Sequence, residues 1–171
     1  MKFVRLDSFT DKKSKQIYRA YTRTFPEEER RDHARFLGLY RQPEVFIFGI
    51  LEDIYFVGYI ILWKLKDFVF VEHFEIFSTL RGKNYGSRVM QALQKKYDKI
   101  TLEIEPPYLG SIAAKRLRFY EKNGFKVLSE CYTQPSYIKE KPSVELYLLS
   151  NTNFKNPEVI IKEIHSTVYR F

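Results

Sequence analysis

The chain has 171 residues but little cysteine and no long apolar segment, and both shortages limit what it can be. Its single cysteine, Cys131, excludes an internal disulfide and is most simply a small residue in or beside a strand. The longest apolar run, Ile54 to Trp63, is interrupted by Gly58 and is too short to span a membrane. The first residues, MKFVRLDSF, lack the apolar core of a signal peptide, so we expect a cytoplasmic protein.

Signatures of several enzyme classes are missing as well. No cluster of His, Cys and carboxylate residues has the spacing of a metal site, so we expect no metal. No GxSxG motif is present, which leaves a serine hydrolase unsupported. Apolar residues, by contrast, make up 44% of the chain and aromatic residues 17%. These contents exclude a disordered protein, and the length suits one domain with a full core.

Apolar periodicity predicts that the first half of the chain contains two helices and four strands. After a first strand, Lys2–Leu6, the pattern predicts helices over Lys12–Arg23 and Pro26–Tyr40, with Pro26 at a first helical position. Three apolar runs separated by short polar turns then predict an antiparallel meander. These runs are Glu44–Leu51, Ile54–Leu65 and Phe68–Phe77.

From Ser87 the spacing of apolar residues becomes helical, and Met90, Leu93 and Tyr97 fall on one face. The elements that follow are a strand over Lys99–Glu105, a helix with Ala113, Leu117 and Tyr120 on one face, and closing strands over Phe125–Cys131 and Ser143–Leu149, joined by a loop through Pro135 and Pro142. A last helix is predicted from the cap Asn156 and the first residue Pro157, with an apolar face of Ile160, Ile164 and Val168.

The most informative segment lies between the third meander strand and the Ser87 helix. It reads Arg81-Gly82-Lys83-Asn84-Tyr85-Gly86-Ser87. A strand, a tight turn containing glycine and a helix start form an anion-binding device, because the first helical N–H groups are free and the helix dipole is positive there. Glycine permits close approach of a phosphate, and Asn84 tolerates the left-handed region. In isolation, an ordinary turn with solvated basic residues fits equally well.

A second segment, Leu117 to Phe125, reads as the end of a helix, with Gly124 in the position of a left-handed cap. The Arg81–Ser87 loop followed by the segment FYEKNGF resembles the GNAT superfamily of N-acetyltransferases. Arg81, Asn84 and Gly86 stand at the three motif positions of its phosphate loop, with Asn84 replacing the middle glycine. Val71–Ile76 and Leu102–Ile104 resemble the fourth and fifth strands of the family.

The resemblance implies an α/β (α+β) fold: a mixed, mostly antiparallel sheet of about seven strands flanked by helices. Residues 1–150 would form the acetyltransferase domain, and residues 151–171 an additional C-terminal helix that packs on the domain or makes a homodimer contact. The implied activity moves an acetyl group from acetyl-CoA to a primary amine, of a small cationic molecule or of a peptide or protein. The implied coenzyme A contacts are the backbone at Phe74 and Ile76, the whole Arg81–Ser87 loop (Arg81, Gly82, Lys83, Asn84, Tyr85, Gly86, Ser87) and Arg116.

The resemblance also suggests catalytic residues. Tyr120 matches the tyrosine that protonates the leaving sulfur, although its periodicity equally fits a core aromatic. Glu103 matches the glutamate that serves as base in members that acetylate ribosomal-protein N-termini. Five extra residues, among them Pro106 and Gly110, separate Glu103 from Tyr120 relative to that subgroup, and such an insertion can displace Glu103.

Other carboxylates compete for the role of base. Strand alternation places Glu103 and Glu105 on one face, where two carboxylates raise one another's pKa and attract a cationic amine. Glu72, on the neighbouring strand, is the alternative, and Glu75 faces the other side unless a bulge intervenes. His73 is a further candidate, although a lone histidine on a strand is more often structural.

The net charge of +8 leaves a second class of function to consider. Residues 81–99 carry six basic and one acidic residue, residues 110–126 carry five and one, and the rest of the chain is net −1. The excess therefore lies where the resemblance places the polyanionic coenzyme A, with Arg81, Lys83, Arg88, Lys115 and Arg116 as the better phosphate candidates. The alternative is a non-catalytic acyl-CoA-binding or basic nucleic-acid-binding module, with aromatic rings as stacking platforms. Their alternation in strands favours a core and argues against nucleic acid.

Overall fold

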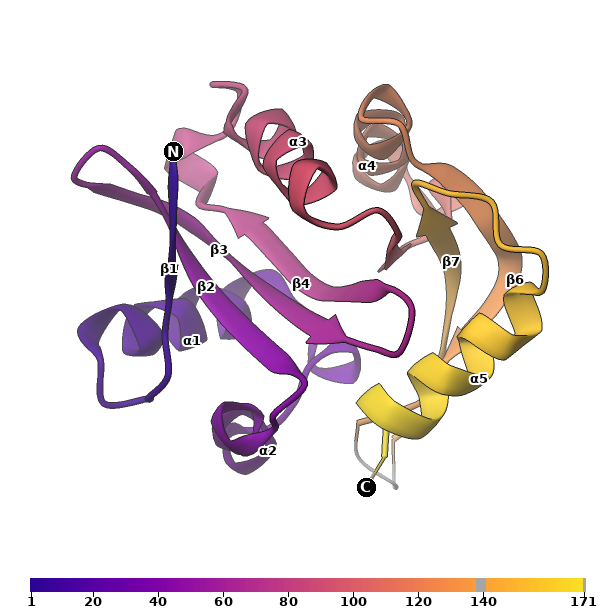
Figure 1. The fold of residues 1–171 in the computed structure, drawn as a ribbon, viewed down its shortest axis with the longest axis horizontal. Helices are drawn as coiled ribbons and strands as arrows, with labels where there is room; N and C mark the ends of the chain where they lie inside the picture. The colour runs from indigo at the N-terminus through magenta and orange to yellow at the C-terminus, as the bar shows by residue number, and fades with distance from the viewer. Residues whose placement is uncertain (138–140, 171) are drawn as a thin grey trace.

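The structure, a computed structural model, describes residues 1–137 and 141–170. A seven-stranded sheet with the order β1-β2-β3-β4-β5-β7-β6 runs through the molecule (Figure 1). Its strands are β1 Lys2–Arg5, β2 Val45–Glu52, β3 Tyr55–Lys64, β4 Val69–Ile76, β5 Ile100–Ile104, β6 Lys126–Gln134 and β7 Val144–Ser150. All neighbouring pairs are antiparallel except β4 and β5, which are parallel. The predicted meander and the mixed, mostly antiparallel sheet are confirmed.

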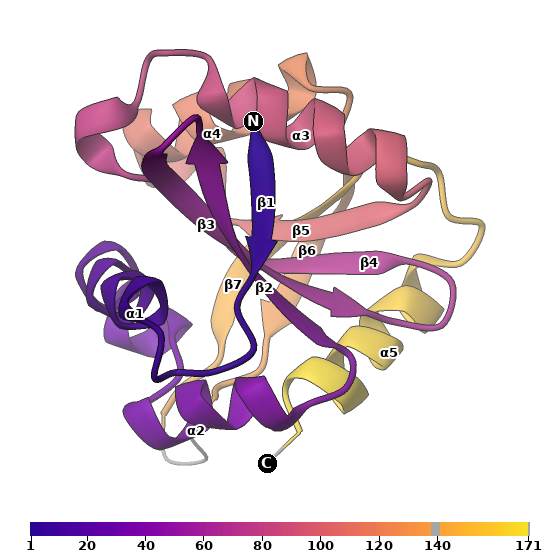
Figure 2. The same ribbon diagram turned by 60° about the vertical axis from the view of Figure 1, so that its left-hand side comes forward.

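Helices cover both faces of the sheet (Figures 1 and 2). They are α1 Lys12–Thr24, α2 His33–Gly38, α3 Tyr85–Lys96, α4 Ser111–Lys122 and α5 Pro157–Val168, with 3-10 turns at Glu27–Glu29, Leu39–Arg41, Ser78–Leu80 and Pro107–Leu109. Residues of α1, α2 and α5 share one buried cluster with the sheet, and residues of α3 and α4 share another. The sheet therefore separates two cores, because each strand sends alternate side chains to opposite faces.

The predicted helix over Pro26–Tyr40 is wrong. Arg30 and Asp32 have extended backbone, which ends the first 3-10 turn, and the Asp32 side chain caps α2 by accepting from the Arg35 amide at 2.8 Å. Between them Arg31 turns into the core, where its amide donates to the Tyr21 hydroxyl at 2.5 Å. The Asp32 cap and the buried Arg31 therefore interrupt the helix that was predicted to be continuous over Pro26–Tyr40.

The last helix is part of a core. Ile160, Ile164 and Val168 are buried in the cluster that contains Tyr59 and Trp63. Pro157 is in the first turn as predicted, but the Asn156 side chain makes no capping hydrogen bond. The division of the chain at residue 150 stays a prediction.

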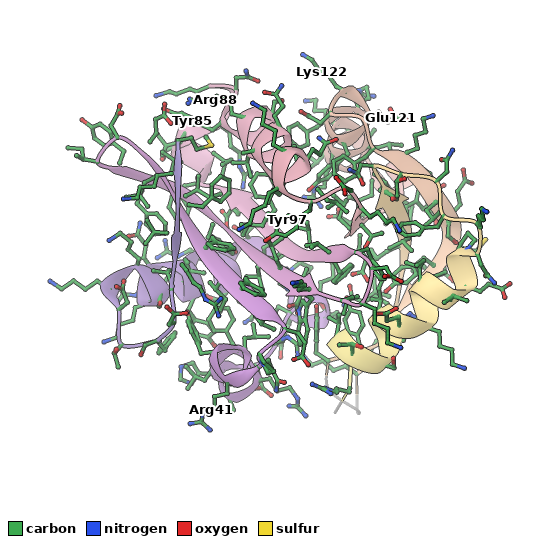
Figure 3. All side chains as sticks on the ribbon, viewed as in Figure 1. Arg41, Tyr85, Arg88, Tyr97, Glu121 and Lys122 are labelled. Atoms are coloured by element: carbon green, nitrogen blue, oxygen red, sulfur yellow. The ribbon has the colours of Figure 1, made fainter. Side chains whose placement is uncertain are left out.

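The molecular surface is charged over many elements. Arg41, Glu121 and Lys122 are exposed and point outward from different parts of the fold (Figure 3). Cys131 is exposed on the edge strand β6, in the kind of position expected for it. Within the described residues, no helix has the length and apolarity needed to cross a membrane.

The strands β4 and β5 separate at their carboxyl ends. Over the described sheet, their pairing joins only Val69–Val71 to Ile100–Leu102, while β4 continues to Ile76. On its other side β4 pairs with β3 through a register shift that leaves Glu72 without a partner. This bulge and the separation of the strands create the opening in which the candidate site lies.

Candidate active site

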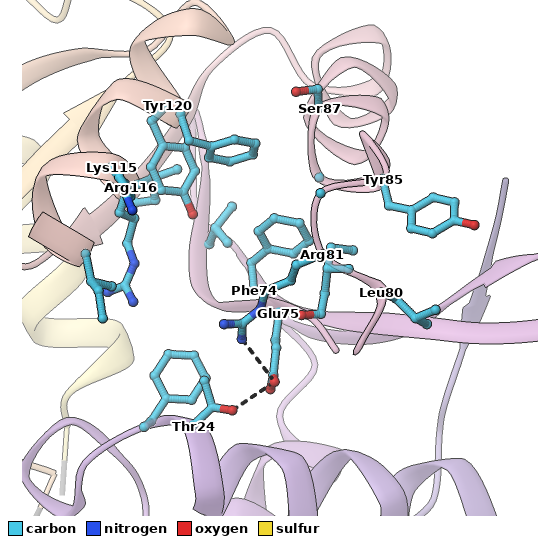
Figure 4. A pocket seen from close by; sticks show the side chains of 18 of the residues that line it. Thr24, Phe74, Glu75, Leu80, Arg81, Tyr85, Ser87, Lys115, Arg116 and Tyr120 are labelled. Carbon is cyan, nitrogen blue, oxygen red and sulfur yellow. Dashed lines mark hydrogen bonds and ion pairs between the residues drawn. The ribbon is translucent and has the colours of Figure 1, made fainter. Parts of the chain in front are cut away.

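A cavity of about 590 Å³ occupies the opening between β4 and β5 (Figure 4). It extends from the start of α3, past α4, to the far side of the sheet, where the end of α1 closes it. Its lining includes Thr24, Phe25, Glu72, Phe74, Glu75, Ile76, Arg81, Gly82, Asn84, Tyr85, Gly86, Ser87, Glu103, Ile112, Lys115, Arg116, Phe119 and Tyr120. Of the residues predicted to contact coenzyme A or its phosphates, Lys83 and Arg88 are not in the lining described here.

One end of the cavity is formed by the loop between β4 and α3. Gly82 has φ +79° and Asn84 has φ +60°, so the left-handed conformation expected at Asn84 is confirmed. The backbone bond from the Arg88 amide to the Asn84 carbonyl, at 3.2 Å, begins the helix. Three amides, of Tyr85, Gly86 and Ser87, precede this bond, and the Asn84 side chain does not cap them. These free N–H groups line the cavity and can bind an anion.

Gly86 has a packing role in addition to the predicted close approach of a phosphate. It lies in the first turn of α3 and is not among the residues with positive φ. A Cβ atom at Gly86 would instead lie 3.0 Å from Phe119 Cζ and 3.1 Å from Phe119 Cε2. The glycine therefore lets α3 and α4 approach beside the anion-binding end.

Not every predicted cation points into the cavity. Lys115 and Arg116 do, from α4, and Arg116 pairs with Glu105. Arg81 folds back, donating to the Ile76 carbonyl at 2.9 Å and lying 3.5 Å from Glu75. Arg88 is outside the lining, because its guanidinium binds Glu52 at 2.8 and 3.1 Å and lies 6.0 Å from the Tyr85 ring. Tyr85 points away from the cavity (Figures 3 and 4), so only its backbone serves the site.

Tyr120 extends from the last turns of α4 with its hydroxyl directed into the cavity (Figure 4). Its ring packs on Phe119 and Phe125, with centroids 5.0 and 5.7 Å away. Burial raises the pKa of Tyr120 to about 12, and nearby Arg116 opposes the shift. The α4 end is fixed as predicted: Gly124 has φ +85°, and the amides of Gly124 and Phe125 bind the Glu121 and Tyr120 carbonyls.

Glu103 faces the same cavity from β5. The Tyr132 hydroxyl donates to one of its carboxylate oxygens, and the Tyr169 hydroxyl donates to the other at 2.7 Å. Burial raises the pKa of Glu103 to about 8; the two phenols lower it, and Glu72 and Glu29 raise it further. Solvent entering the cavity weakens this effect, and a ligand that excludes solvent strengthens it. A carboxyl group with a pKa near 8 suits proton transfer at physiological pH.

Glu72 has its oxygens occupied. Arg31 Nε donates to Oε1 at 2.8 Å, and the Trp63 indole N–H donates to Oε2 at 2.6 Å. Burial acts against ionisation, but the charge of Arg31, with further help from the Trp63 hydrogen bond, holds the pKa of Glu72 below its ordinary value. Glu72 is therefore a buried partner of Arg31 that lines the cavity, with little capacity to accept a further proton.

His73 is a core residue. Burial lowers its pKa to about 4, so it is neutral and its position 3.8 Å from Glu72 is not an ion pair at neutral pH. Its ring packs on Tyr21 and Phe25, on the face opposite Phe74.

The bulge decides where Glu75 points. Glu75 lies on the same side of the sheet as Glu72, where it accepts from the Thr24 hydroxyl at 2.8 Å. The prediction that Glu103 and Glu105 lie together is wrong, since β5 ends at Ile104 and Glu105 pairs with Arg116 instead. Three carboxylates, Glu72, Glu75 and Glu103, thus line the far end of the cavity.

Three residues that sequence reasoning missed hold two of these carboxylates, Glu103 and Glu72. Tyr132 and Tyr169 come from the last strand pair and the end of α5, and Arg31 from the turn before α2. No motif marks them, because each is defined by a contact with a residue more than 25 positions away. Among the described residues, no group of three or more His, Cys, Asp or Glu side chains is arranged to hold a metal ion.

The free helix start after the Arg81–Ser87 loop is the anion-binding feature that the sequence predicted, and comparison with known proteins agrees with the family resemblance. The Acetyltransferase (GNAT) family model matches residues 14–125. The chain therefore belongs to the GNAT acetyltransferase family.

Two further matches show how the relatives compare. The chain is similar to a Bacteroides thetaiotaomicron protein described as "Putative acetyltransferase from GNAT family", with 28% identity, a TM-score of 0.91 and coverage of 99% of this chain and 98% of that one. It is 34% identical over 64 residues to "Putative acetyltransferase YjbC" of Bacillus subtilis, a match spanning 37% of this chain and only 33% of that relative's length. A spermidine N-acetyltransferase of Vibrio cholerae shares the fold, with 12% identity, a TM-score of 0.60 and coverage of 87% and 91%.

Proposed function

We propose that the protein transfers an acetyl group from acetyl-CoA to a primary amine by direct attack of the amine on the thioester. The single observation that supports this most strongly is the continuity of the cavity. It joins the uncapped start of α3, which suits a pyrophosphate, to Tyr120 and Glu103 on either side of the gap between β4 and β5. Direct transfer requires the two reactants to meet in one enclosed space.

Acetyl-CoA supplies the activated acetyl group, and the residues of the chain bind it, orient it and move protons. The amides at the start of α3, with Lys115 and Arg116, bind the phosphates. The β4 backbone at Phe74 and Ile76 lies along the gap beside the thioester. Tyr120 donates its proton to the departing sulfur, and Glu103 accepts a proton from the amine.

The far end of the cavity favours a cationic acceptor. Glu72, Glu75 and Glu103 lie there beside Phe25 and Thr24, opposite the basic end at Lys115 and Arg116. A carboxylate-lined end attracts an ammonium group, and its protein walls strengthen the attraction. A small cationic amine or the amine of a basic peptide fits this charge.

The test of this function combines binding with turnover. Acetyl-CoA is expected to raise the melting temperature, since a ligand that binds only the native state stabilises it by mass action. A panel of amines, assayed by release of free thiol, is then expected to contain cationic acceptors that are acetylated and neutral ones that are not. The absence of a thermal shift at millimolar acetyl-CoA would count against the proposal, and binding without thiol release would indicate a non-catalytic acyl-CoA-binding module.

Gly86→Val is expected to weaken acetyl-CoA binding by at least tenfold. The new side chain would meet Phe119 within the anion-binding end, and overpacking of this kind also costs about 1–3 kcal/mol of stability. Isothermal titration of the variant measures the affinity. Gly38→Val is the matched control, because Gly38 is also helical but has no atom within 4 Å of its added Cβ. Unchanged affinity in folded Gly86→Val would show that the phosphates bind elsewhere.

A further inference from the structure

The end of the chain reaches the candidate active site. Tyr169, directly after α5, is 3% exposed and donates to Glu103 Oε2 at 2.7 Å. Tyr132, on β6, is 1% exposed and donates to the other oxygen. Both carboxylate oxygens of the proposed base are therefore held by phenols, one from an edge strand and one from the residue after the last helix.

Packing fixes both phenols. The Tyr169 ring lies 5.0 Å from the Tyr137 ring, and the His165 ring on α5 lies 5.4 Å from Tyr132 and 6.3 Å from Tyr169. The residue before Tyr169 is also anchored, since the Val168 carbonyl accepts from Arg31 at 2.7 Å, and Arg31 binds Glu72. One hydrogen-bonded assembly thus connects the end of α5 to two of the carboxylates in the cavity.

We infer that Tyr132 and Tyr169 are positioning residues for Glu103, and that the segment after residue 150 completes the active site by holding this carboxylate toward the cavity. This inference rests on the proposed function, in which Glu103 accepts the proton of the amine. Burial and the neighbouring Glu103 raise the pKa of both phenols, so both hydroxyls keep their protons and can donate. The other groups that face Glu103 are Glu72 on β4, Glu29 in the first 3-10 turn and Tyr137.

The expected effect of removing a phenol follows from the sign of its contribution. A hydroxyl that donates to the carboxylate favours the ionised form, so its loss raises the pKa of Glu103. Tyr132→Phe and Tyr169→Phe keep the rings and delete only the donors. Each is expected to raise the titration midpoint of Glu103 by about one pH unit, and the double variant by more. Turnover at pH 7 then falls about tenfold and recovers as the pH rises above the new midpoint.

Two measurements on the full chain test the inference. Carbon-13 NMR of δ-labelled glutamate measures the titration midpoint of Glu103 independently of turnover, and Glu103→Gln assigns the signal. The pH profile of thiol release measures the apparent pKa of the group on which turnover depends. Tyr147→Phe is the control, because Tyr147 lies on the neighbouring strand β7 but packs against the cluster on the opposite face.

The outcomes are distinct. The inference is supported if the titration midpoint of Glu103 and the acidic limb of the pH profile, where turnover rises with pH, move together in both variants but not in the control. Unmoved midpoints overturn it and leave acetyl transfer intact. Midpoints that move while the acidic limb stays in place overturn the catalytic part, because Glu103 is then not the base. Failure of the proposed function itself is recognised separately, as absence of thiol release by the parent protein with every amine tested.

Discussion

Tyr120→Phe is expected to lower turnover by about 10²–10⁴, the usual contribution of a general acid. The substitution keeps the ring against Phe119 and Phe125 and deletes only the hydroxyl that faces the cavity. Burial raises the pKa of this phenol to about 12, so it stays protonated across the working pH range and can donate to the departing sulfur. Acetyl-CoA affinity is expected to stay within about twofold, because the proposed binding groups lie on other residues.

Single-turnover measurements give the cleanest comparison, since they report the chemical step and exclude product release. Tyr97→Phe serves as the control: Tyr97 follows α3 and is not in the lining of the cavity. If Tyr120→Phe reacts as fast as the parent where chemistry limits the rate, the ring is a packing residue and the sulfur takes its proton from solvent.

Most of the sheet is predictable from the sequence because the spacing of apolar residues differs between strands and helices. Strands β2 and β3 are almost wholly apolar, β4 begins with an apolar run, and short polar turns separate the three strands. Helix α3 begins where the spacing of apolar residues becomes helical. The start of α3 and the end of α4 were also predictable, because Asn84 and Gly124 are residue types that accept a left-handed backbone. Local chemistry thus sufficed to predict the conformation of the loop that we propose as the phosphate site.

Features that depend on one displaced residue could not be predicted. The bulge at Glu72 reverses the face on which Glu75 lies, and nothing in the residues of β4 announces the register shift. The turn at Arg31 follows from a carboxylate on a strand that is 41 positions later in the chain. Both features shape the acidic end of the cavity, so the sequence alone leaves the choice among the glutamates open.

The geometry also explains why a buried acid is retained at Glu103. Burial raises the pKa of the Glu103 carboxyl group from 4.5 to about 8; the two phenols oppose this rise, and Glu72 and Glu29 add to it. Between these two values the folded protein keeps a proton that the unfolded chain releases. The free energy of unfolding therefore decreases as the pH rises through this window. The buried Glu103 carboxyl group thus lowers stability above pH 4.5, and a buried acid of this kind is typical of a functional site.

Glu103→Gln is expected to lower turnover by about 10²–10⁴ at pH 8. At that pH half of Glu103 is ionised, while an acceptor amine with a free pKa of about 8–10 is still largely protonated and needs a base. Turnover of the parent should rise as the pH increases through about 8. In the variant this limb should be replaced by one that follows the amine, so the deficit shrinks toward pH 10. The same substitution should raise the melting temperature at pH 8, because it removes the cost of ionising a buried acid.

Glu72→Gln is the matched comparison and should fail in a different way. It leaves the Arg31 guanidinium buried without its carboxylate, an arrangement that typically costs about 3–5 kcal/mol. Chemical denaturation should show this loss of stability, while the folded fraction of the variant should keep the acidic limb, shifted to lower pH because the Glu72 charge no longer raises the pKa of Glu103. If Glu72→Gln loses the limb and Glu103→Gln keeps it, the base lies on β4 and the phenols around Glu103 serve the fold. If both variants keep it, the amine loses its proton before it enters the cavity, and the carboxylates act only by attracting the cation.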